Sequence, residues 1–300
     1  MICRRPFMKG AVGFPCGQCQ PCRINRRRLW TTRLCLESFC HDDACFLTLT
    51  YNDDNLPFPG SLDPAALRGF IKRLRYGLGS NRIRFFGVGE YGDRTWRPHY
   101  HAIIFGMSPL QGALAETAWS VRGDPIGFVH VGDVTPASCQ YVSGYTVKKM
   151  TVKHDHRLRA WRRDGVELHP EFARMSNRPG IGAPAMSVLC EKLLTDAGLD
   201  DFMATGDVPM AIRFGGSKKP LGRYLRRKLR EEMGVSAEDA KAIKERFYSE
   251  KTAEMRELLR ASSLAGTSRS MRDVLTDSTK QQAASMEALA RIHDSKGKVL

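Results

Sequence analysis

Two histidines separated by one residue are the first candidates for chemistry in this 300-residue chain. His99 and His101 flank Tyr100 in the run HYHAIIFG, whose composition predicts a strand over residues 99–106. Alternate side chains of a strand share a face, so the two imidazoles should lie side by side while Tyr100 points the other way. Two neutral imidazoles can bind one divalent cation and leave coordination positions open for substrate oxygens.

Glu90 is the candidate for a third ligand. It ends the run RIRFFGVGE, which predicts a strand over residues 82–90. If this strand and the next form a hairpin that pairs Glu90 with His99, Val88 lies opposite His101, and opposed residues share a face. A carboxylate beside two imidazoles suits Mg²⁺ or Mn²⁺ that polarises a phosphate. The structural alternative is that Glu90 stands idle at an exposed strand end.

A second group of reactive side chains lies in QYVSGYTVKKM, within a helix expected over residues 137–150. Tyr141 and Tyr145 are four residues apart and therefore share a helix face, and Lys148 follows on nearly the same face. A phenol can attack phosphorus and hold a covalent intermediate. Its pKa is ordinarily about 10, so a nearby ammonium or a metal-bound phosphate must assist it. The alternative is an amphipathic helix whose tyrosines only pack against a sheet.

Cysteines cluster near the N-terminus. Cys16, Cys19 and Cys22 form a C-x2-C-x2-C run, with Cys3 upstream. Four thiolates at such spacing can complete a tetrahedral zinc site; an iron–sulfur cluster or unligated thiols are the alternatives. Nine cysteines without an export signal do not indicate a disulfide framework.

The net charge of +15 favours a polyanionic partner, because each neutralised phosphate releases counterions. The charge is concentrated in two blocks, residues 1–40 and 213–230, whereas basic and acidic residues cancel from residue 231 onward. The residues predicted to contact DNA are Arg26, Arg27, Arg28, Lys149, Lys218, Lys219, Arg223, Arg226 and Arg227. The chain has neither an apolar run of the roughly 18 residues that span a bilayer nor a signal-peptide core, so no membrane partner is expected.

The order of elements predicts an α+β fold. Further strands are expected over 45–51 and 127–134, and further helices over 29–39, from Pro64 after the capping Asp63, and over 110–119. This order gives an antiparallel-rich central sheet with flanking helices. Three segments are expected: a Cys-rich basic segment over 1–40 whose first 28 residues are loop and metal knuckle, a catalytic domain with a basic extension over 41–230, and a charged helical tail over 231–300.

Together these motifs resemble a known superfamily. FLTLTY, then GEYG with RPHYHAIIFG, then YVSGYTVKK are similar to the three motifs of HUH endonucleases with two tyrosines, especially the replication initiators of Microviridae of the gokushovirus-like group. PCGQCQPCR followed by Trp30, the RPGIG segment and the later basic run are similar to that group too. Tyr100 departs from the family, where the middle residue is usually hydrophobic, although its ring should still be buried.

The resemblance implies an HUH-type fold and specific roles. His99 and His101 match the metal-binding pair, Tyr141 the first nucleophile, Tyr145 the second, and Lys148 the lysine that follows. The implied activity is metal-dependent nicking and rejoining of single-stranded origin DNA through a 5′-phosphotyrosine, with Mg²⁺ or Mn²⁺ as cofactor and structural Zn²⁺ as an addition. Phage origin DNA and the host helicase and polymerase are the implied partners, in the cytoplasm of the bacterial host.

Three other functions agree with parts of the sequence. An HUH transposase or relaxase would use the same chemistry on another DNA. A non-catalytic nucleic-acid-binding protein would use the basic blocks and a zinc knuckle without nicking. A metal-dependent hydrolase would cleave with water and form no covalent adduct.

Overall fold

The computed structural model describes residues 2–92, 94–145, 158, 165–267 and 269–296. The chain divides into two compact units. The sheet unit consists of Leu29–Leu189 and Arg213–Leu221, and the helical unit consists of Met1–Arg28, Cys190–Ile212 and Gly222–Leu300. These boundaries differ from the three segments expected from the sequence, whose independent folding stays a prediction.

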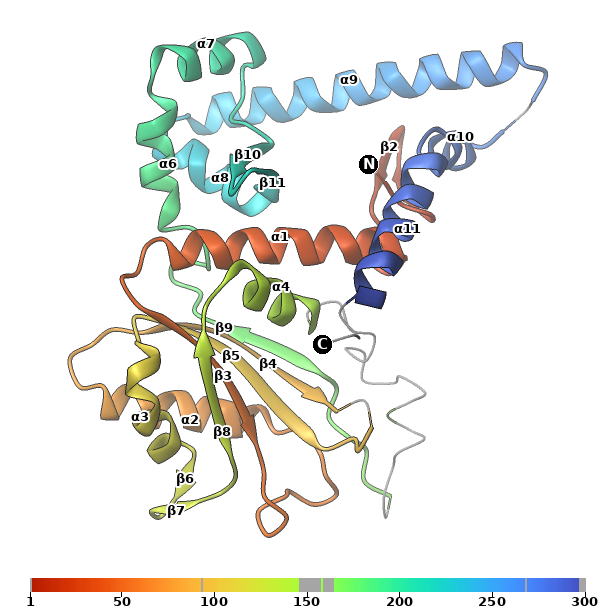
Figure 1. Ribbon diagram of the computed structural model, residues 1–300. Helices are drawn as coiled ribbons and strands as arrows, with labels where there is room; N and C mark the ends of the chain where they lie inside the picture. The colour runs from red at the N-terminus through yellow and green to blue at the C-terminus, as the bar shows by residue number, and fades with distance from the viewer. Residues whose placement is uncertain (1, 93, 146–157, 159–164, 268, 297–300) are drawn as a thin grey trace. The chain divides into compact units, whose positions relative to one another are not determined.

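A five-stranded antiparallel sheet forms the centre of the sheet unit (Figure 1). Its strands, in spatial order, are β8 (Val129–Asp133), β3 (Ala44–Thr50), β5 (Pro98–Phe105), β4 (Arg84–Tyr91) and β9 (Phe172–Met175). The α+β prediction with an antiparallel central sheet is confirmed. Two short pairs accompany it: β6 (Ser120–Val121) with β7 (Asp124–Pro125), and β10 (Ala211–Phe214) with β11 (Ser217–Pro220).

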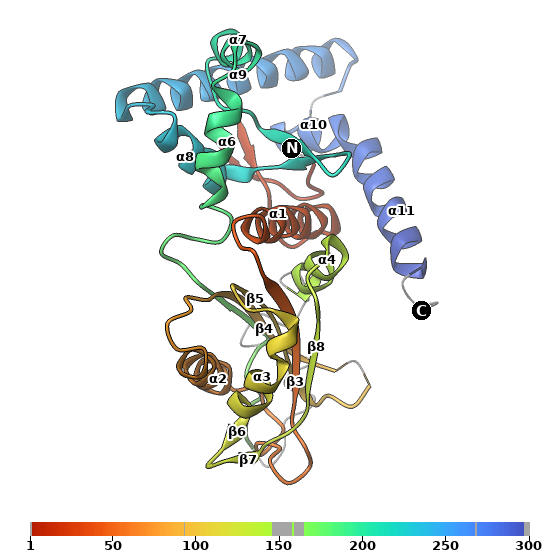
Figure 2. The same cartoon turned by 60° about the vertical axis from the view of Figure 1, so that its left-hand side comes forward.

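One face of the sheet is covered by α2 (Pro64–Gly77), the short η1 (Pro109–Gln111) and α3 (Gly112–Ala118) (Figure 2). Asp63 caps α2 as predicted, because its carboxylate accepts a hydrogen bond of 2.7 Å from the amide of Ala65. Tyr100 faces this side and is fully buried, and its hydroxyl donates to the Asp63 carbonyl over 3.1 Å. Its ring therefore belongs to the core, as expected.

The opposite face of the sheet packs against α4 (Pro136–Tyr145) and the part of α1 (Gln20–Ser38) that belongs to the sheet unit. The hydroxyls of Thr31 on α1 and Ser143 on α4 are 2.7 Å apart and both buried. The apolar residues that join the helices to this face include Leu34, Phe86, Ile103, Phe105, Cys139 and Val142. Alternation along β5 thus sends His99 and His101 to the face that carries α4.

The start of α1 corrects the sequence prediction. Residues 20–28 were expected to be loop, but the helix begins at Gln20 and runs without a break through the basic residues. Pro21 stands in the first turn, where its missing amide hydrogen has no helical partner to lose, so the proline favours this start.

The RPGIG segment is held against α1. The buried carboxylate of Glu37 accepts hydrogen bonds from the Gly182 amide, over 2.5 Å, and from the Arg84 guanidinium. Arg33 donates to the Ile181 carbonyl over 2.9 Å, and Arg84 to the Pro179 carbonyl over 2.7 Å. Burial works against ionisation of Glu37, but hydrogen bonds from His41, Arg84 and Gly182 outweigh it and hold the pKa of this carboxyl below its usual value.

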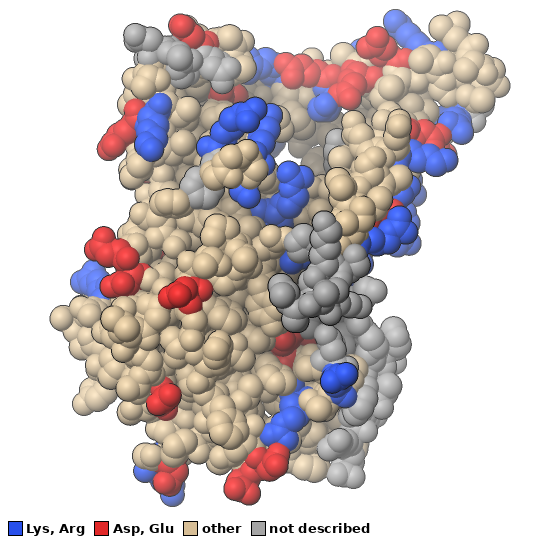
Figure 3. All heavy atoms as spheres, in the orientation of Figure 1, with Lys and Arg blue, Asp and Glu red and all other residues tan. Residues whose placement is uncertain are grey.

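The helical unit contains a hairpin of β1 (Phe7–Lys9) and β2 (Val12–Phe14) beside a set of helices. These are α7 (Asp196–Thr205), α8 (Gly222–Glu232), α9 (Ala237–Leu264), α10 (Met271–Ser278) and α11 (Lys280–Lys296); α6 (Ala185–Leu193) crosses the boundary between the units. Figure 3 shows acidic and basic side chains of both signs along α9. Within the described ranges, no helix is both long and apolar enough to span a membrane.

Candidate functional site: an imidazole and carboxylate pair beside two phenols

Neighbouring strands bring Glu90 and the histidine pair together. β4 and β5 pair in the register that the sequence predicts, with Glu90 opposite His99 and Val88 opposite His101. Glu90 is 6% exposed and His101 is 5% exposed. Nε2 of His101 lies 2.9 Å from Oε1 of Glu90. The imidazole and the carboxylate therefore form a closely paired, nearly dry group.

Hydrogen bonds at the far side of each ring determine how the imidazoles are oriented. Nδ1 of His99 is 2.8 Å from the Arg97 carbonyl, which can only accept, so Nδ1 carries the proton and Nε2 of the neutral ring keeps its lone pair. Burial lowers the pKa of His99, which favours this neutral form. Nδ1 of His101 is 3.0 Å from Oγ1 of Thr48 on β3. Thr48 can accept from Nδ1, which would leave Nε2 of His101 free to ligate.

The loop that follows Glu90 fixes the acceptor for His99. The Arg97 carbonyl also accepts from the Gly92 amide over 3.0 Å. The Arg97 guanidinium binds Oδ1 of Asp53 over 2.5 Å and the Tyr51 carbonyl over 2.9 Å. A Cβ at Gly92 would lie only 3.0 Å from Cε1 of His99. The second glycine of the GEYG motif therefore makes room for the imidazole.

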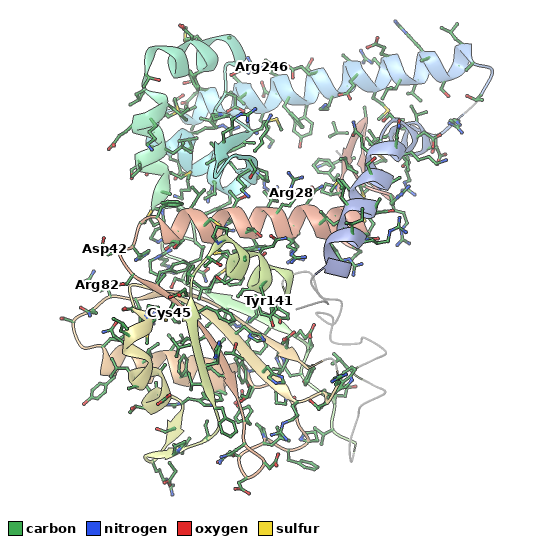
Figure 4. All side chains as sticks on the ribbon, viewed as in Figure 1. Arg28, Asp42, Cys45, Arg82, Tyr141 and Arg246 are labelled. Carbon is green, nitrogen blue, oxygen red and sulfur yellow. The ribbon has the colours of Figure 1, made fainter. Side chains whose placement is uncertain are left out.

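Both tyrosines of α4 lie beside His101. The Tyr145 ring stacks on the imidazole with a centroid separation of 4.8 Å and an interplanar angle of 2°. The Tyr141 ring lies edge-on, 5.6 Å from the imidazole and 5.0 Å from the Tyr145 ring. The ring of Phe46 on β3 contacts both His101 and Tyr141. Figure 4 labels Tyr141, where α4 lies over the sheet.

The two phenols have different surroundings. Tyr141 is 49% exposed, whereas Tyr145 is partly buried. Burial, the negative charge of Glu90 and hydrogen bonds with Tyr141 and Glu90 raise the pKa of Tyr145 above its usual value. A DNA strand can thus reach the Tyr141 hydroxyl more readily than that of Tyr145.

Helix α4 begins where the sequence indicates. Thr135 and Ser138 cap it reciprocally, because the Ser138 amide donates to Oγ1 of Thr135 over 3.1 Å and the Thr135 amide to Oγ of Ser138 over 2.7 Å. Its described part ends at Tyr145. Lys148 and Lys149 lie outside the described residues, so their predicted roles stay predictions.

The other residues predicted to contact DNA are distributed over α1, β11 and α8. Those with exposed side chains are Arg26, Arg28, Lys218, Arg223 and Arg227, while Arg27 and Lys219 are half-buried. Arg226 differs from the rest, since its guanidinium binds the Asp207 carboxylate and, over 3.1 Å, the Val208 carbonyl. Arg230 binds the same carboxylate over 2.7 and 2.8 Å. Arg226 therefore stabilises the helical unit, whatever it adds to DNA binding.

The histidine pair with Glu90 is a less compact ligand set than the cysteines. In the part of the chain that the structure describes, only Cys3, Cys16, Cys19 and Cys22 bring three or more ligand atoms within 4.8 Å of one another. Glu90 and His101 meet that distance as a pair, so one cation bound by all three residues requires the His99 ring to turn toward them. For Cys16, burial works against ionisation, but hydrogen bonds from the Cys19 and Gln18 backbone and neighbouring thiols lower its pKa to about 6.

Sequence reasoning missed a basic groove on the other face of the sheet unit. A cavity of about 580 Å³ lies between α2 and the edge strand β9. Arg68, Lys72, Arg75 and Arg174 line it, and none of its described lining residues is acidic. The spacing of the three α2 residues, at i, i+4 and i+7, was the available signal, because it places them on one helix face.

The fold and the site together define an α+β protein in which a sheet-borne imidazole and carboxylate pair lies beside two helix-borne phenols. Residues 44–150, which contain the central strands and both tyrosines, match the family described as replication-associated protein ORF2. The resemblance to replication initiators indicated by the sequence is confirmed at the level of replication-associated proteins of this type.

Three curated proteins are similar to the chain. Replication-associated protein VP4 of Bdellovibrio phage phiMH2K is 36% identical over 48% of this chain and 51% of its own length. Replication-associated protein ORF4 of Chlamydia phage 1 is 33% identical over 47% and 39%. Replication-associated protein ORF2 of Spiroplasma virus 4 is 32% identical over 56% and 55%. The chain thus spans about half the length of the curated relatives it matches, and no solved structure matches it.

Proposed function

We propose that this chain initiates rolling-circle replication of a phage genome by nicking and rejoining single-stranded origin DNA through a 5′-phosphotyrosine. One observation carries the proposal: the Tyr145 ring stacks on His101 at 4.8 Å with Tyr141 edge-on beside it, so two phenols border the imidazole and carboxylate pair. The match of residues 44–150 to replication-associated proteins supports a role in phage replication.

The donor set fits a hard divalent cation such as Mg²⁺ or Mn²⁺. Two ligands at about 2.1 Å in adjacent octahedral positions are about 3.0 Å apart, and Nε2 of His101 lies 2.9 Å from Oε1 of Glu90. His99, oriented by the Arg97 carbonyl, would supply the third ligand atom. When bound, the ion supplies a positive charge that polarises the scissile phosphate.

The chain's own residues orient the reactants. Thr48 and the Arg97 carbonyl hold the imidazoles, while α4 holds both phenols on one face. In the cleavage step a phenol oxygen forms a bond to phosphorus. The bond between phosphorus and the 3′ oxygen breaks, and that oxygen takes up a proton to become the 3′-OH that a polymerase extends. Exchange of one phosphodiester for another conserves its energy, so rejoining needs no nucleotide cofactor.

The difference in exposure gives the tyrosines an order. Tyr141, which is half exposed, attacks first, and Tyr145 attacks the regenerated junction after one round of synthesis. The 3′-OH released in the second attack then rejoins the strand that Tyr141 holds. Two nucleophiles on one helix face allow a single chain to complete the cycle.

The basic residues would bind the DNA backbone. Exposed Arg26 and Arg28 on α1 offer phosphate contacts in the helical unit, and the groove of Arg68, Lys72, Arg75 and Arg174 offers them in the sheet unit. Such contacts position DNA without reading its sequence, so they complement the site rather than define its specificity.

A labelled adduct tests the proposal. The protein is incubated with Mn²⁺ and end-labelled single-stranded DNA from the genome that encodes it, and the products are separated on a denaturing gel. We expect a protein–DNA adduct that EDTA abolishes and that the double variant Tyr141→Phe/Tyr145→Phe lacks. Tyr76→Phe, at a highly exposed tyrosine of α2, is the matched control and should form adduct normally.

Two results would overturn the proposal. Cleavage without any adduct would indicate a hydrolase that uses water. Salt-sensitive DNA binding with neither cleavage nor adduct, across all fragments of the genome, would indicate a non-catalytic binding protein.

A further inference from the structure

Four cysteines meet at the N-terminal end of the helical unit. Cys3 precedes β1, Cys16 follows β2, Cys19 directly precedes α1, and Cys22 lies in the first turn of that helix. Their sulfur atoms all lie within 4.8 Å of one another. The β1–β2 hairpin, with Phe7 opposite Phe14, folds the chain back and brings the first cysteine to the other three.

The sulfur separations match a single tetrahedral ion. Sγ of Cys3 is 3.8 Å from Sγ of Cys19, and Sγ of Cys16 is 4.0 Å from Sγ of Cys22. Four thiolates at about 2.3 Å from one zinc ion are about 3.8 Å apart. An iron–sulfur cluster places several irons between its thiolates and therefore needs a wider set. All four cysteines are free of disulfide bonds.

Backbone amides point at the sulfur atoms. The Cys16 amide donates to Sγ of Cys3 over 3.3 Å, the Arg4 amide to Sγ of Cys19 over 3.4 Å, and the Cys19 amide to Sγ of Cys16 over 3.4 Å. The N-terminal end of α1 adds the positive end of its dipole at Cys19 and Cys22. Amides and a helix start in this arrangement stabilise thiolates, the form in which cysteine binds a metal.

The segment has little other interior. The cluster of buried apolar residues here consists of Cys3, Cys19 and Cys22, with Cys16 packed against it. Strands of three residues joined in a single hairpin are only marginally stable in water. A bound metal would therefore supply the stability that larger apolar side chains supply in bigger cores.

We propose that Cys3, Cys16, Cys19 and Cys22 bind one structural zinc ion that fixes the β1–β2 hairpin to the start of the basic helix α1. The ion holds the first turn of α1 in place, and the exposed Arg26 and Arg28 follow within two turns. The inference does not depend on the nicking activity, because its evidence lies in the helical unit and not at His101.

Metal analysis of the full chain tests the proposal. The protein is produced with zinc in the medium, purified without chelator or affinity metal, and measured by elemental mass spectrometry. We expect about one zinc per chain. Cys3→Ser and Cys22→Ser should lose it, whereas Cys40→Ser and Cys190→Ser, outside the cluster, should keep it.

A second readout covers variants that fail to fold. Cobalt exchanged into the wild-type chain should give the intense visible absorption of a tetrahedral tetrathiolate site. Three results would overturn the proposal: zinc well below one per chain with no cobalt spectrum, iron in place of zinc, or intact masses that show Cys3–Cys19 or Cys16–Cys22 disulfides in freshly purified protein.

Discussion

Nε2 of His101 lies 2.9 Å from Oε1 of Glu90, and the same imidazole carries the stacked ring of Tyr145. Three kinds of reactive group from two strands and one helix thus meet at one residue. The carboxylate and imidazole can share a cation, and the phenols lie next to it. The proposed strand transfer depends on this meeting point, and the following predictions test its parts separately.

Thr48 should tune metal binding through His101. Thr48→Val keeps the shape of the side chain but removes the oxygen 3.0 Å from Nδ1, so the ring loses its orientation. We expect the Mn²⁺ concentration needed for half-maximal cleavage to rise about 10–100-fold, as is usual for a lost partner of a metal-binding histidine. Thr50→Val, on the same strand face, is the control and should leave the requirement unchanged. Equal effects of both variants would contradict the role of Thr48.

The tyrosines should differ in the first turnover. Tyr141 is 49% exposed and Tyr145 is partly buried, so the first attack on an unnicked strand should come from Tyr141. Tyr141→Phe should lower initial adduct formation by at least about 100-fold, as expected for loss of a nucleophile. Tyr145→Phe should still form the first adduct but should fail to rejoin the strand. A reversed pattern, measured on a denaturing gel, would exchange the two assignments.

The basic groove should contribute to DNA binding. Lys72→Gln with Arg75→Gln removes two cations from a surface without acidic lining. For single strands each lost phosphate contact lowers the salt slope of the binding constant by about 0.7, so the pair should lower it by about 1.4. Fluorescence anisotropy at several salt concentrations measures the slope. Arg82→Gln, an exposed arginine of the same unit outside the groove, should leave it unchanged.

Glu37 should make the stability of the chain depend on acid pH. The folded-state pKa of this carboxyl is below its unfolded value, so its contribution is present above the unfolded pKa and is lost as pH falls through the folded pKa. Glu37→Gln should destabilise the neutral-pH protein by on the order of 3 kcal/mol, because Arg84 loses its charged partner. The difference from wild type should shrink below about pH 4, the ordinary range for a carboxyl. Urea unfolding across this range measures it, and a constant difference would contradict the assignment.

The sequence predicted the sheet and its register because alternation and turn residues are local signals. The hairpin of residues 82–90 and 99–106 appears with the expected pairs, and the phenols lie at the histidines. The edge strand β9 was missed, since four residues, FARM, carry no period of their own and become a strand only by pairing with β4. The early start of α1 was missed because a cysteine run indicates loop as readily as helix.

Tertiary partners decided the remaining differences. Arg226 looks like its neighbours in the sequence, yet Asp207, nineteen residues earlier, binds its guanidinium. The groove combines one face of α2 with Arg174 of β9, a strand that the sequence did not indicate. The unequal exposure of Tyr141 and Tyr145 follows from how α4 packs on the sheet, which helical spacing alone does not specify.

Mapping the attached nucleotide tests the central claim most directly. The adduct formed with Mn²⁺ and single-stranded origin DNA is digested with nuclease and protease, and the modified peptide is sequenced by mass spectrometry. The account predicts a nucleotide 5′-phosphate on the hydroxyl of Tyr141 in the wild-type chain. A nucleotide on a residue other than Tyr141 or Tyr145, or cleaved DNA with no modified peptide at all, would contradict it.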